Sequence, residues 1–416
     1  MNIKKVQGFL DYFNNDIILF NYIIEKFKTI VAKYNFQEMI TPIMEYVELF
    51  NRTLGSGTDI VEKEMYIFNS SKEKQIALRP ENTAGIIRAY IENNLSHNLS
   101  GIKKFFYIGP MFRHERPQKG RLRQFYQLGC EVIGSHSPYS DAEIIMLANN
   151  FLLSLNLYNI ELHINSIGCN TCRKEYLKVL INYYEQQKEN ICENCKIRLQ
   201  KNPLRLLDCK EEKCIAIKNN APKINQHICN DCKSHFENVL KILNNFNIKY
   251  LINPFLVRGL DYYTHTTFEF INKNLGAQNA VLAGGRYNDL IEILGGEKEP
   301  AIGFAAGLER LLLSSQNLEI KSNQKKIFIA TYNYNAHDYA LQIAEKIRKI
   351  NNYSVEINFL DKSLKAQLRT ADKLDFDFVI VIGDDEINSK KFKIKNLKTG
   401  EEKEIIEIDL ENYFSL

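Results

Sequence analysis

The sequence predicts an α+β protein: an antiparallel sheet with flanking helices, followed by a smaller α/β domain. Within residues 16–34, apolar side chains recur every three or four positions, which is typical of an amphipathic helix: Ile17, Phe20, Ile24, Phe27, Val31 and Tyr34. Two strand-like runs, 103–115 and 123–134, are joined by a polar loop, which favours an antiparallel pair. Residues 325–416 alternate between strand-like and helix-like segments in the βαβαβ order of a small α/β domain.

Composition sets the broad class of the protein. At about 100–200 residues per domain, a chain of 416 residues holds several domains. Hydrophobic residues make up 45% of the chain, so a large core can form without disulfides. The net charge of +4 is too small to demand or to exclude a nucleic-acid partner.

Membrane insertion and secretion are not expected. No apolar run approaches the ~20 residues of a membrane span, and the start, MNIKKVQGFLDYFNND, lacks the apolar core of a signal peptide. We therefore expect a cytoplasmic protein with reduced cysteines.

The segment 162–253 differs from its flanks, because eight of the nine cysteines fall there. They form four close pairs: Cys169 with Cys172, Cys192 with Cys195, Cys209 with Cys214, and Cys229 with Cys232. Such spacing suits tetrahedral zinc sites, so we expect one or two structural zinc ions; reduced, buried cysteines or sites that have lost their metal are the alternatives. Each pair could join any of the other three. Cys130 stands apart, and we expect it to serve packing.

Basic residues gather in the loop between the two strand-like runs. Seven Lys or Arg residues and one acidic residue, Glu115, lie between Lys103 and Arg123. Arg113, Arg258 and Arg310 could together grip a triphosphate, because guanidinium binds phosphate oxygens bidentately. For any one of them alone, a surface ion pair is the plainer interpretation. No Gly-rich phosphate loop is present, so ATP would have to bind by another scheme.

Six ordered motifs resemble a known family. YIGPMFRHERPQKGRLRQFYQLGCEVIG (107–134) and PAIGFAAGLERLLL (300–313) resemble motifs 2 and 3 of class II aminoacyl-tRNA synthetases. Pro42 resembles the proline of motif 1 at the dimer interface. LRPENTAG (78–85), LVRGLDYYTHTTFE (256–269) and AGGRYNDLIEILGG (283–296) are similar to segments of the histidine enzyme. The chain thus resembles histidyl-tRNA synthetases over nearly its whole length.

The resemblance implies a domain plan. Residues 1–161, with motifs 1 and 2, and 254–320, with the histidine motifs and motif 3, form a class II catalytic core. Residues 162–253 form a helical, Cys-rich insertion domain. Residues 325–416 form an anticodon-binding domain, and the polar stretch 313–326 is the linker. Residues 325–416 contain fifteen basic and sixteen acidic residues, so the overall charge of this domain does not favour RNA. Any RNA contact there must come from a local face.

The implied reaction joins L-histidine and ATP to histidyl-adenylate and diphosphate, then transfers histidine to the 3′ end of tRNA(His), in a homodimer. Arg113 and Arg258 are the implied catalytic residues at the α-phosphate. Arg310 binds the γ-phosphate end, and Glu115 assists near the adenine or metal. Mg²⁺ bridges the outer phosphates.

The resemblance also implies a histidine pocket. Glu81, Thr83 and Gln127 accept hydrogen bonds from the amino group, and Glu131 and Tyr263 meet the two ring nitrogens. Arg258, Tyr262 and Tyr287 line the same pocket. Arg116, Gln118 and Arg123 are candidates for contact with the tRNA acceptor end. Asn82 stands where the family usually has Gly; because Asn tolerates a left-handed backbone, we expect the turn to survive.

Two other functions are compatible with parts of this pattern. One is the regulatory subunit of ATP phosphoribosyltransferase, a histidine sensor on the same scaffold, which generally lacks the anticodon-type domain. The other is a class II synthetase for a different amino acid, against which RGLDYY (258–263) and Glu131 argue.

Overall fold

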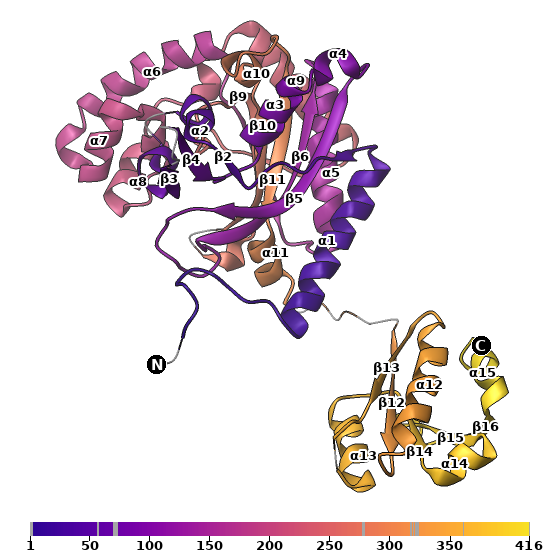
Figure 1. The fold of residues 1–416 in the computed structure, drawn as a ribbon. Helices are drawn as coiled ribbons and strands as arrows, with labels where there is room; N and C mark the ends of the chain where they lie inside the picture. The colour runs from indigo at the N-terminus through magenta and orange to yellow at the C-terminus, as the bar shows by residue number, and fades with distance from the viewer. Residues whose placement is uncertain are drawn as a thin grey trace. The chain divides into compact units, whose positions relative to one another are not determined.

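The computed structural model describes residues 3–415 except 56–57, 70–73, 277–278, 317, 319, 321–323 and 361. The chain divides into two compact units, Met1–Leu318 and Glu319–Leu416 (Figure 1). The division falls within the polar stretch 313–326 that the sequence indicates as a linker. Within the described residues, no helix is both long and apolar enough to cross a membrane.

An eight-stranded sheet forms the centre of the larger unit. Its strands, in spatial order, are β1 (Gln37–Glu38), β5 (Lys103–Phe112), β6 (Gln124–Ile133), β11 (Ala301–Gly307), β10 (Ala280–Arg286), β9 (Thr264–Ile271), β7 (Glu161–Ser166) and β8 (Leu251–Ile252). The six inner strands are antiparallel, and only the two-residue strands at the edges pair in parallel. The predicted antiparallel pair, β5 and β6, is confirmed. The segment 162–253 takes part in this sheet at both of its ends, through β7 and β8.

One face of the sheet is covered by four helices: α1 (Asn15–Lys33), α5 (Pro138–Ser154), α9 (Asn230–Asn245) and α11 (Leu308–Ser314). Side chains alternate between the faces along each strand. On β6, Leu128, Cys130 and Val132 point into this helical layer and are buried. The predicted packing role of Cys130 is therefore confirmed, as is the amphipathic helix at the N-terminal end.

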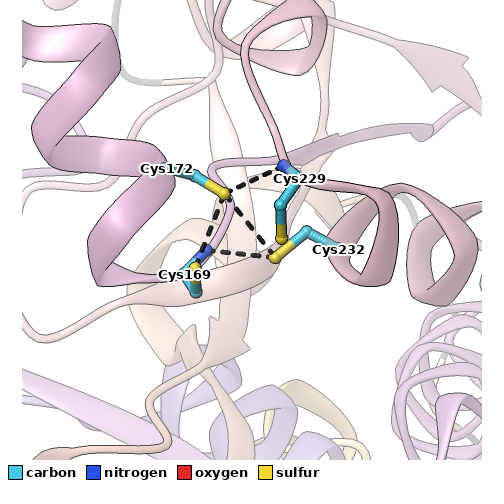
Figure 2. Close-up of side chains that lie close together, drawn as sticks. All are labelled: Cys169, Cys172, Cys229 and Cys232. Carbon is cyan, nitrogen blue, oxygen red and sulfur yellow. Dashed lines mark hydrogen bonds between the residues drawn. The ribbon is translucent and has the colours of Figure 1, made fainter.

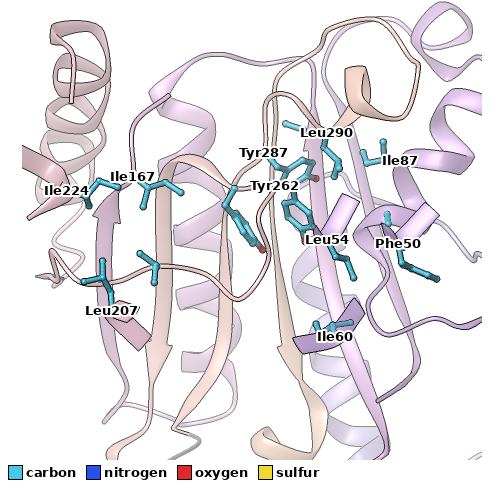
Figure 3. Packing of buried hydrophobic residues seen from close by; sticks show 14 of the residues in the cluster. Phe50, Leu54, Ile60, Ile87, Ile167, Leu207, Ile224, Tyr262, Tyr287 and Leu290 are labelled. Carbon is cyan, nitrogen blue, oxygen red and sulfur yellow. The ribbon is translucent and has the colours of Figure 1, made fainter. Parts of the chain in front are cut away.

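The opposite face carries the residues that the sequence assigns to histidine and ATP. It is covered by α2 (Val47–Leu54), α3 (Thr83–Glu92), α10 (Leu290–Ile293) and a small sheet of β2 (Met44–Tyr46), β4 (Gln75–Leu78) and β3 (Ile67–Asn69). Pro42 lies just before β2, in agreement with the predicted position at a strand edge. Figure 3 shows Leu54 and Leu290 packing around Tyr262 and Tyr287 on this side.

The Cys-rich segment is helical, as predicted. Its helices are α6 (Asn170–Glu185), α7 (Glu193–Lys201) and α8 (Glu212–Asn219), with α9 returning to the sheet. The first three gather on the side of the sheet away from α1 (Figure 1).

The smaller unit has a five-stranded sheet in the order β13-β12-β14-β15-β16. The predicted βαβαβ elements are confirmed: β12 (Lys325–Thr331), α12 (Ala336–Arg348), β13 (Tyr353–Ile357), α13 (Leu364–Lys373) and β14 (Phe378–Ile382). An antiparallel hairpin, β15 (Lys391–Asn396) and β16 (Glu402–Ile406), extends this sheet beyond the prediction, between the short helices α14 (Asp384–Ser389) and α15 (Leu410–Ser415).

Candidate active site

A cleft of about 620 Å³ opens on the face of the large sheet that α1 does not cover. The eleven residues that the sequence assigns to histidine and ATP all line it: Glu81, Thr83, Arg113, Glu115, Gln127, Glu131, Arg258, Tyr262, Tyr263, Tyr287 and Arg310. They come from segments up to 229 positions apart, from Glu81 to Arg310, and the antiparallel sheet brings them together.

Glu131 lies at the bottom of the cleft and is almost wholly buried. Thr83 Oγ1 donates a hydrogen bond of 2.7 Å to Glu131 Oε1, and the Tyr287 hydroxyl donates to Oε2. Burial raises the pKa of Glu131 to about 8, although these two hydrogen bonds oppose the shift. Gly303, opposite on β11, makes room, because a Cβ there would lie 1.8 Å from Glu131 Oε2.

Glu81 is held at the start of α3. Its two carboxylate oxygens accept hydrogen bonds from the backbone N–H groups of Thr83, at 2.7 Å, and Ala84, at 3.0 Å. Burial raises the pKa of Glu81 in spite of these bonds. The carboxylate therefore has a fixed direction within the cleft.

Asn82, the departure from the family pattern, has φ −120°, so this turn does not need a left-handed backbone. Its side-chain oxygen accepts hydrogen bonds from Thr41 Oγ1, at 2.6 Å, and Arg79 Nη1, at 3.2 Å. Arg79 also donates to the carbonyl oxygen of Pro110 at 2.9 Å. The asparagine thus ties the Glu81 turn to strand β5, which a glycine could not do.

Arg258 sits in a loop before β9 and pairs with Glu269 on that strand. Its guanidinium lies 5.5 Å from the centre of the Tyr263 ring. Burial works to lower the pKa of Arg258, but Glu269 and the neighbouring tyrosines outweigh it, so the group stays cationic.

Two further arginines face the same space from other elements. Arg113 Nε donates to the Pro80 carbonyl oxygen at 2.9 Å, and Arg310 Nη1 donates to the Ala280 carbonyl oxygen at 2.7 Å. Burial lowers the pKa of Arg310 to about 10, and the neighbouring cations Arg113 and Arg121 add to the effect. An anion placed among these groups would relieve their mutual repulsion.

Sequence reasoning missed several charged residues of the cleft, among them Glu64, Arg121 and Glu269. Arg121 pairs with Glu115 and lies 3.6 Å from Glu64. Glu115 is therefore engaged by an arginine of the basic loop. Nothing local distinguished Arg121 from the other basic residues of that loop. Glu269, in contrast, is the last residue of the motif 256–269 and could have been noted as a carboxylate eleven positions after Arg258.

An unpaired buried acceptor also faces the cleft. Gln127 Oε1 is buried and has no hydrogen-bond donor among the described residues. Such a group costs free energy unless a ligand supplies a donor. An ammonium group, with three donors, is suited to it.

The three residues assigned to the tRNA acceptor end lie outside the lining of the cleft. Arg116 and Gln118 are exposed near the tip of the basic loop. Arg123 Nε donates to the Glu115 carbonyl oxygen at 3.1 Å, and its backbone bonds to Gly8, so it ties the loop to the N-terminal segment.

The insertion cysteines form two separate groups of four. Within each group, the four Sγ atoms all lie within 4.8 Å of one another. Cys169 and Cys172 join Cys229 and Cys232 (Figure 2), while Cys192 and Cys195 join Cys209 and Cys214. The pairing that the sequence left open is thereby settled, and each set can hold a metal ion.

Comparison with known proteins agrees with this geometry. A family model described as histidyl-tRNA synthetase matches residues 8–311, and one described as an anticodon-binding domain matches residues 326–415. The histidine–tRNA ligase of Thermodesulfovibrio yellowstonii is 46% identical over 405 residues, which are 97% of this chain and 96% of the relative. The chain belongs to the histidyl-tRNA synthetase family.

Other members of the histidyl-tRNA synthetase family match over similar lengths. The histidine–tRNA ligase of Halothermothrix orenii is 44% identical over 98% of this chain and 97% of its own. The apo crystal structure of S. aureus histidyl-tRNA synthetase has a TM-score of 0.83 at 35% identity, with all of both chains covered. The class II fold predicted from the sequence is confirmed.

A structure described as an ATP phosphoribosyltransferase regulatory subunit/histidyl-tRNA synthetase from Bacillus halodurans matches at TM-score 0.66 and 19% identity. It shares the fold alone. The present chain differs from the regulatory subunit considered above, because it has an anticodon-binding domain and keeps Arg113, Arg258 and Arg310.

Proposed function

We propose that this chain is a histidine–tRNA ligase, which forms histidyl-adenylate and diphosphate from L-histidine and ATP and then charges tRNA(His). One observation carries the proposal. A buried polar pocket around Glu131 adjoins three half-buried arginines, Arg113, Arg258 and Arg310, in a single cleft. The pocket suits an imidazole, and the arginines suit a triphosphate.

In the proposed complex, histidine enters with its ring toward Glu131 and Tyr263. A neutral imidazole has one donor and one acceptor, so a carboxylate and a hydroxyl can satisfy both nitrogens. Tyr262 and Tyr287 pack against the ring. A phenylalanine or leucine side chain would offer no hydrogen-bonding group to Glu131 and Tyr263, which predicts strong discrimination against both.

The amino group of histidine meets acceptors at the rim of that pocket. Glu81 supplies a fixed carboxylate, and Gln127 supplies the unpaired oxygen. Thr83 completes the set. This places the substrate carboxylate toward Arg113 and Arg258.

In the first step, the histidine carboxylate attacks the α-phosphorus of ATP in line and diphosphate leaves. The attacking oxygen is already ionised, so no general base is required. Charge builds on the non-bridging oxygens, and fixed guanidinium groups stabilise that charge more than the ground state. Arg113 and Arg258 act at the α-phosphate, Arg310 at the γ-phosphate end, and Glu115 near the adenine.

Class II synthetases use ATP with Mg²⁺, which neutralises the outer phosphates when bound. Carboxylates are the ligands that this ion prefers. Glu115 lies 3.8 Å from Arg113, and Glu269 pairs with Arg258. The ion pair between Glu269 and Arg258 would have to break before Glu269 could bind Mg²⁺ or Arg258 could bind a phosphate.

The tRNA would be contacted at two places. At the acceptor end, we propose the loop residues Arg116, Gln118 and Arg123. In the 325–416 domain, the aromatic side chains Tyr332, Tyr334 and Phe359 are 64%, 84% and 56% exposed. They follow the carboxyl ends of β12 and β13 and could stack on single-stranded bases.

The same proposal includes zinc, a second copy of the chain and a cytoplasmic location, where tRNA charging takes place. Residues 162–253 act as an insertion domain between the two parts of the catalytic core, 1–161 and 254–320. Their eight cysteines bind structural zinc, supported by the two four-sulfur groups. A second copy covers the apolar side chains around Pro42.

Pyrophosphate exchange into ATP, measured with each of the twenty standard amino acids, tests the assignment. We expect exchange with histidine and with no other amino acid. Exchange that depends on a different amino acid would overturn the histidine pocket, and no exchange at all would overturn the adenylation step.

A further inference from the structure

We propose that the two four-sulfur groups bind one zinc ion each, and that the two ions hold the loop 258–263 in place through separate contacts with Asp261. Site A consists of Cys169, Cys172, Cys229 and Cys232, and site B of Cys192, Cys195, Cys209 and Cys214. This inference rests on the proposed zinc binding and goes further, because it makes metal occupancy a condition for histidine binding.

The sulfur positions fit tetrahedral zinc. With Zn–S bonds of about 2.3 Å, the sulfurs of a ZnS₄ tetrahedron lie about 3.8 Å apart. In site A, Cys172 Sγ lies 3.5 Å from Cys169 Sγ and 3.9 Å from Cys232 Sγ (Figure 2). In site B, Cys192 Sγ lies 3.8 Å from Cys209 Sγ. A disulfide needs about 2.05 Å, so the spacing favours a shared ion over covalent pairs.

Backbone groups in both sites already support thiolates. In site A, the N–H of Cys169 donates to Cys232 Sγ at 3.3 Å, and the N–H of Cys229 donates to Cys172 Sγ at 3.0 Å. In site B, the N–H of Cys192 donates to Cys214 Sγ at 3.3 Å. Hydrogen bonds to the ligating sulfurs stabilise their charged form and orient them around the ion.

Site A lies where the chain leaves the sheet for the insertion. Gly168, which directly precedes Cys169, has φ +67°, and its carbonyl oxygen accepts from the His265 N–H at 2.8 Å. A Cβ at Gly168 would lie 2.6 Å from Cys172 Cβ. Site A therefore joins the first turn of α6 to the first turn of α9, against the strand β9 that follows the loop.

The residue after Cys172 reaches the loop directly. Arg173 Nη1 donates hydrogen bonds to the carbonyl oxygens of Asp261, at 2.9 Å, and Tyr263, at 3.0 Å. These two carbonyls flank Tyr262, which lines the histidine pocket. Arg173 lies on the turn of α6 that carries Cys172. An ion in site A therefore fixes the backbone from which the Arg173 side chain extends to the loop.

Site B is connected to the same loop through Asn202. Asn202 follows α7, between Cys195 and Cys209, and its Nδ2 donates to both oxygens of the Asp261 carboxylate, at 2.9 and 3.0 Å. Gly55 leaves space for that carboxylate, since a Cβ there would lie 2.4 Å from Asp261 Oδ2. Arg173 therefore binds the backbone carbonyl of Asp261, and Asn202 binds its side-chain carboxylate.

The loop 258–263 is held by side-chain contacts and not by backbone pairing with other segments of the described chain. No backbone-to-backbone hydrogen bond joins residues 258–263 to other parts of the described chain. Yet the loop carries Arg258, Tyr262 and Tyr263 into the cleft. Arg173 and Asn202 are therefore positioning residues: they touch no substrate, and they act through Asp261.

Metal content is the first measurement. Full-length protein purified without chelator should contain two zinc ions per chain by elemental analysis. Cys232→Ser and Cys195→Ser should each lose one ion, and Cys232→His, which keeps a zinc ligand, should retain both. Less than half a zinc per chain in the unaltered protein overturns the metal sites.

Histidine binding is the second measurement. Arg173→Ala and Asn202→Ala should keep two zinc ions but raise the dissociation constant for histidine about tenfold, as expected for loss of a hydrogen bond to a charged or fixed group. Asn220→Ala is the matched control, because Asn220 lies in the same insertion and its side-chain amide donates to the Ala216 carbonyl oxygen of its own helix. It should change neither value.

A double-variant cycle tests the coupling. Asn202→Ala should weaken histidine binding in the zinc-loaded protein and add no further loss to Cys195→Ser. Fully additive losses, or histidine binding unchanged in Arg173→Ala and Asn202→Ala, overturn the inference while leaving the ligase assignment intact. Absence of pyrophosphate exchange in the unaltered protein overturns the assignment instead.

Discussion

At the scale of single residues, Arg258 is the side chain on which adenylation should depend most. Among the described arginines of the cleft, Arg258 alone both faces the proposed triphosphate site and lies over the ring of Tyr263, a residue of the proposed histidine pocket. Arg258→His should lower kcat/KM for pyrophosphate exchange by about 10²–10³-fold, the usual effect of removing one preorganised donor at developing charge. Arg52→His, at an exposed arginine paired with Glu48, should leave exchange unchanged. Exchange retained in Arg258→His would contradict the proposed α-phosphate contact.

Glu131 makes a prediction about pH. Its pKa rises from 4.5 in the unfolded chain to about 8 in the fold, because burial disfavours the charge. The folded state therefore binds a proton more tightly, and stability should fall as pH rises from about 5 to about 8. Glu131→Gln removes this titration, so its free energy of unfolding should exceed that of the unaltered protein by an amount that grows over this range, to the order of a few kcal/mol.

Urea unfolding of the ligand-free protein at several pH values measures this difference. Glu309, whose pKa is raised to about 7, is present in both proteins, so its contribution cancels in the comparison. The exposed Glu356→Gln serves as control and should show no such trend. A constant difference between Glu131→Gln and the unaltered protein across pH would be inconsistent with a buried, titrating Glu131.

Single residues also mark the limit of sequence reading. The motif residues could be assigned because each lies in a distinctive string, such as RGLDYY or LRPENTAG. Arg173, Asn202 and Arg121 lie in ordinary polar stretches, and their partners are distant in sequence. Arg173 meets Asp261, 88 positions away, and no local pattern encodes that contact.

At the scale of elements, the close pairing of β6 and β11 shapes the proposed histidine pocket. Gly303 on β11 faces Glu131 on β6. Gly303→Ala should displace the Glu131 carboxylate, since the added Cβ would lie 1.8 Å from Oε2 and 2.5 Å from the Cys130 carbonyl oxygen. We expect KM for histidine to rise at least about tenfold, on the scale of 1–3 kcal/mol for overpacking, with a smaller change in KM for ATP. Equal changes in both would point to general distortion of the sheet.

Elements with a clear period could be predicted, and others could not. Helix α1 and strands β5 and β6 show regular apolar spacing, and the predicted ranges agree with the structure to within a few residues. The hairpin of β15 and β16 was missed because KFKIKN and EKEII are half charged and resemble a solvated run. The edge strands β1 and β8 have two residues each, too few for any periodicity.

At the scale of the whole molecule, neither the strand order nor the site could be obtained from local patterns. β6 pairs with β5, its neighbour in sequence, but also with β11, whose residues lie about 170 positions further along. Glu131, Thr83 and Tyr287 meet only because of that order. The family resemblance supplied the residues of the pocket, since it carries the tertiary arrangement that periodicity alone does not.

Assembly of two copies is the remaining prediction at this scale. Around Pro42, large apolar side chains are exposed in the single chain: Ile40, Ile43, Met44, Tyr46, Ile67 and Phe68. Exposed apolar side chains gathered around one short sheet are typical of an interface. A charge at its most exposed member, Ile40→Glu, should shift the protein toward monomer in analytical ultracentrifugation, because a buried unpaired carboxylate is costly. Ile408→Glu is the matched control: Ile40 is 83% exposed and Ile408 is 84% exposed, but Ile408 lies in the smaller unit. A monomeric unaltered protein, or equal effects of both substitutions, would contradict an interface at this surface.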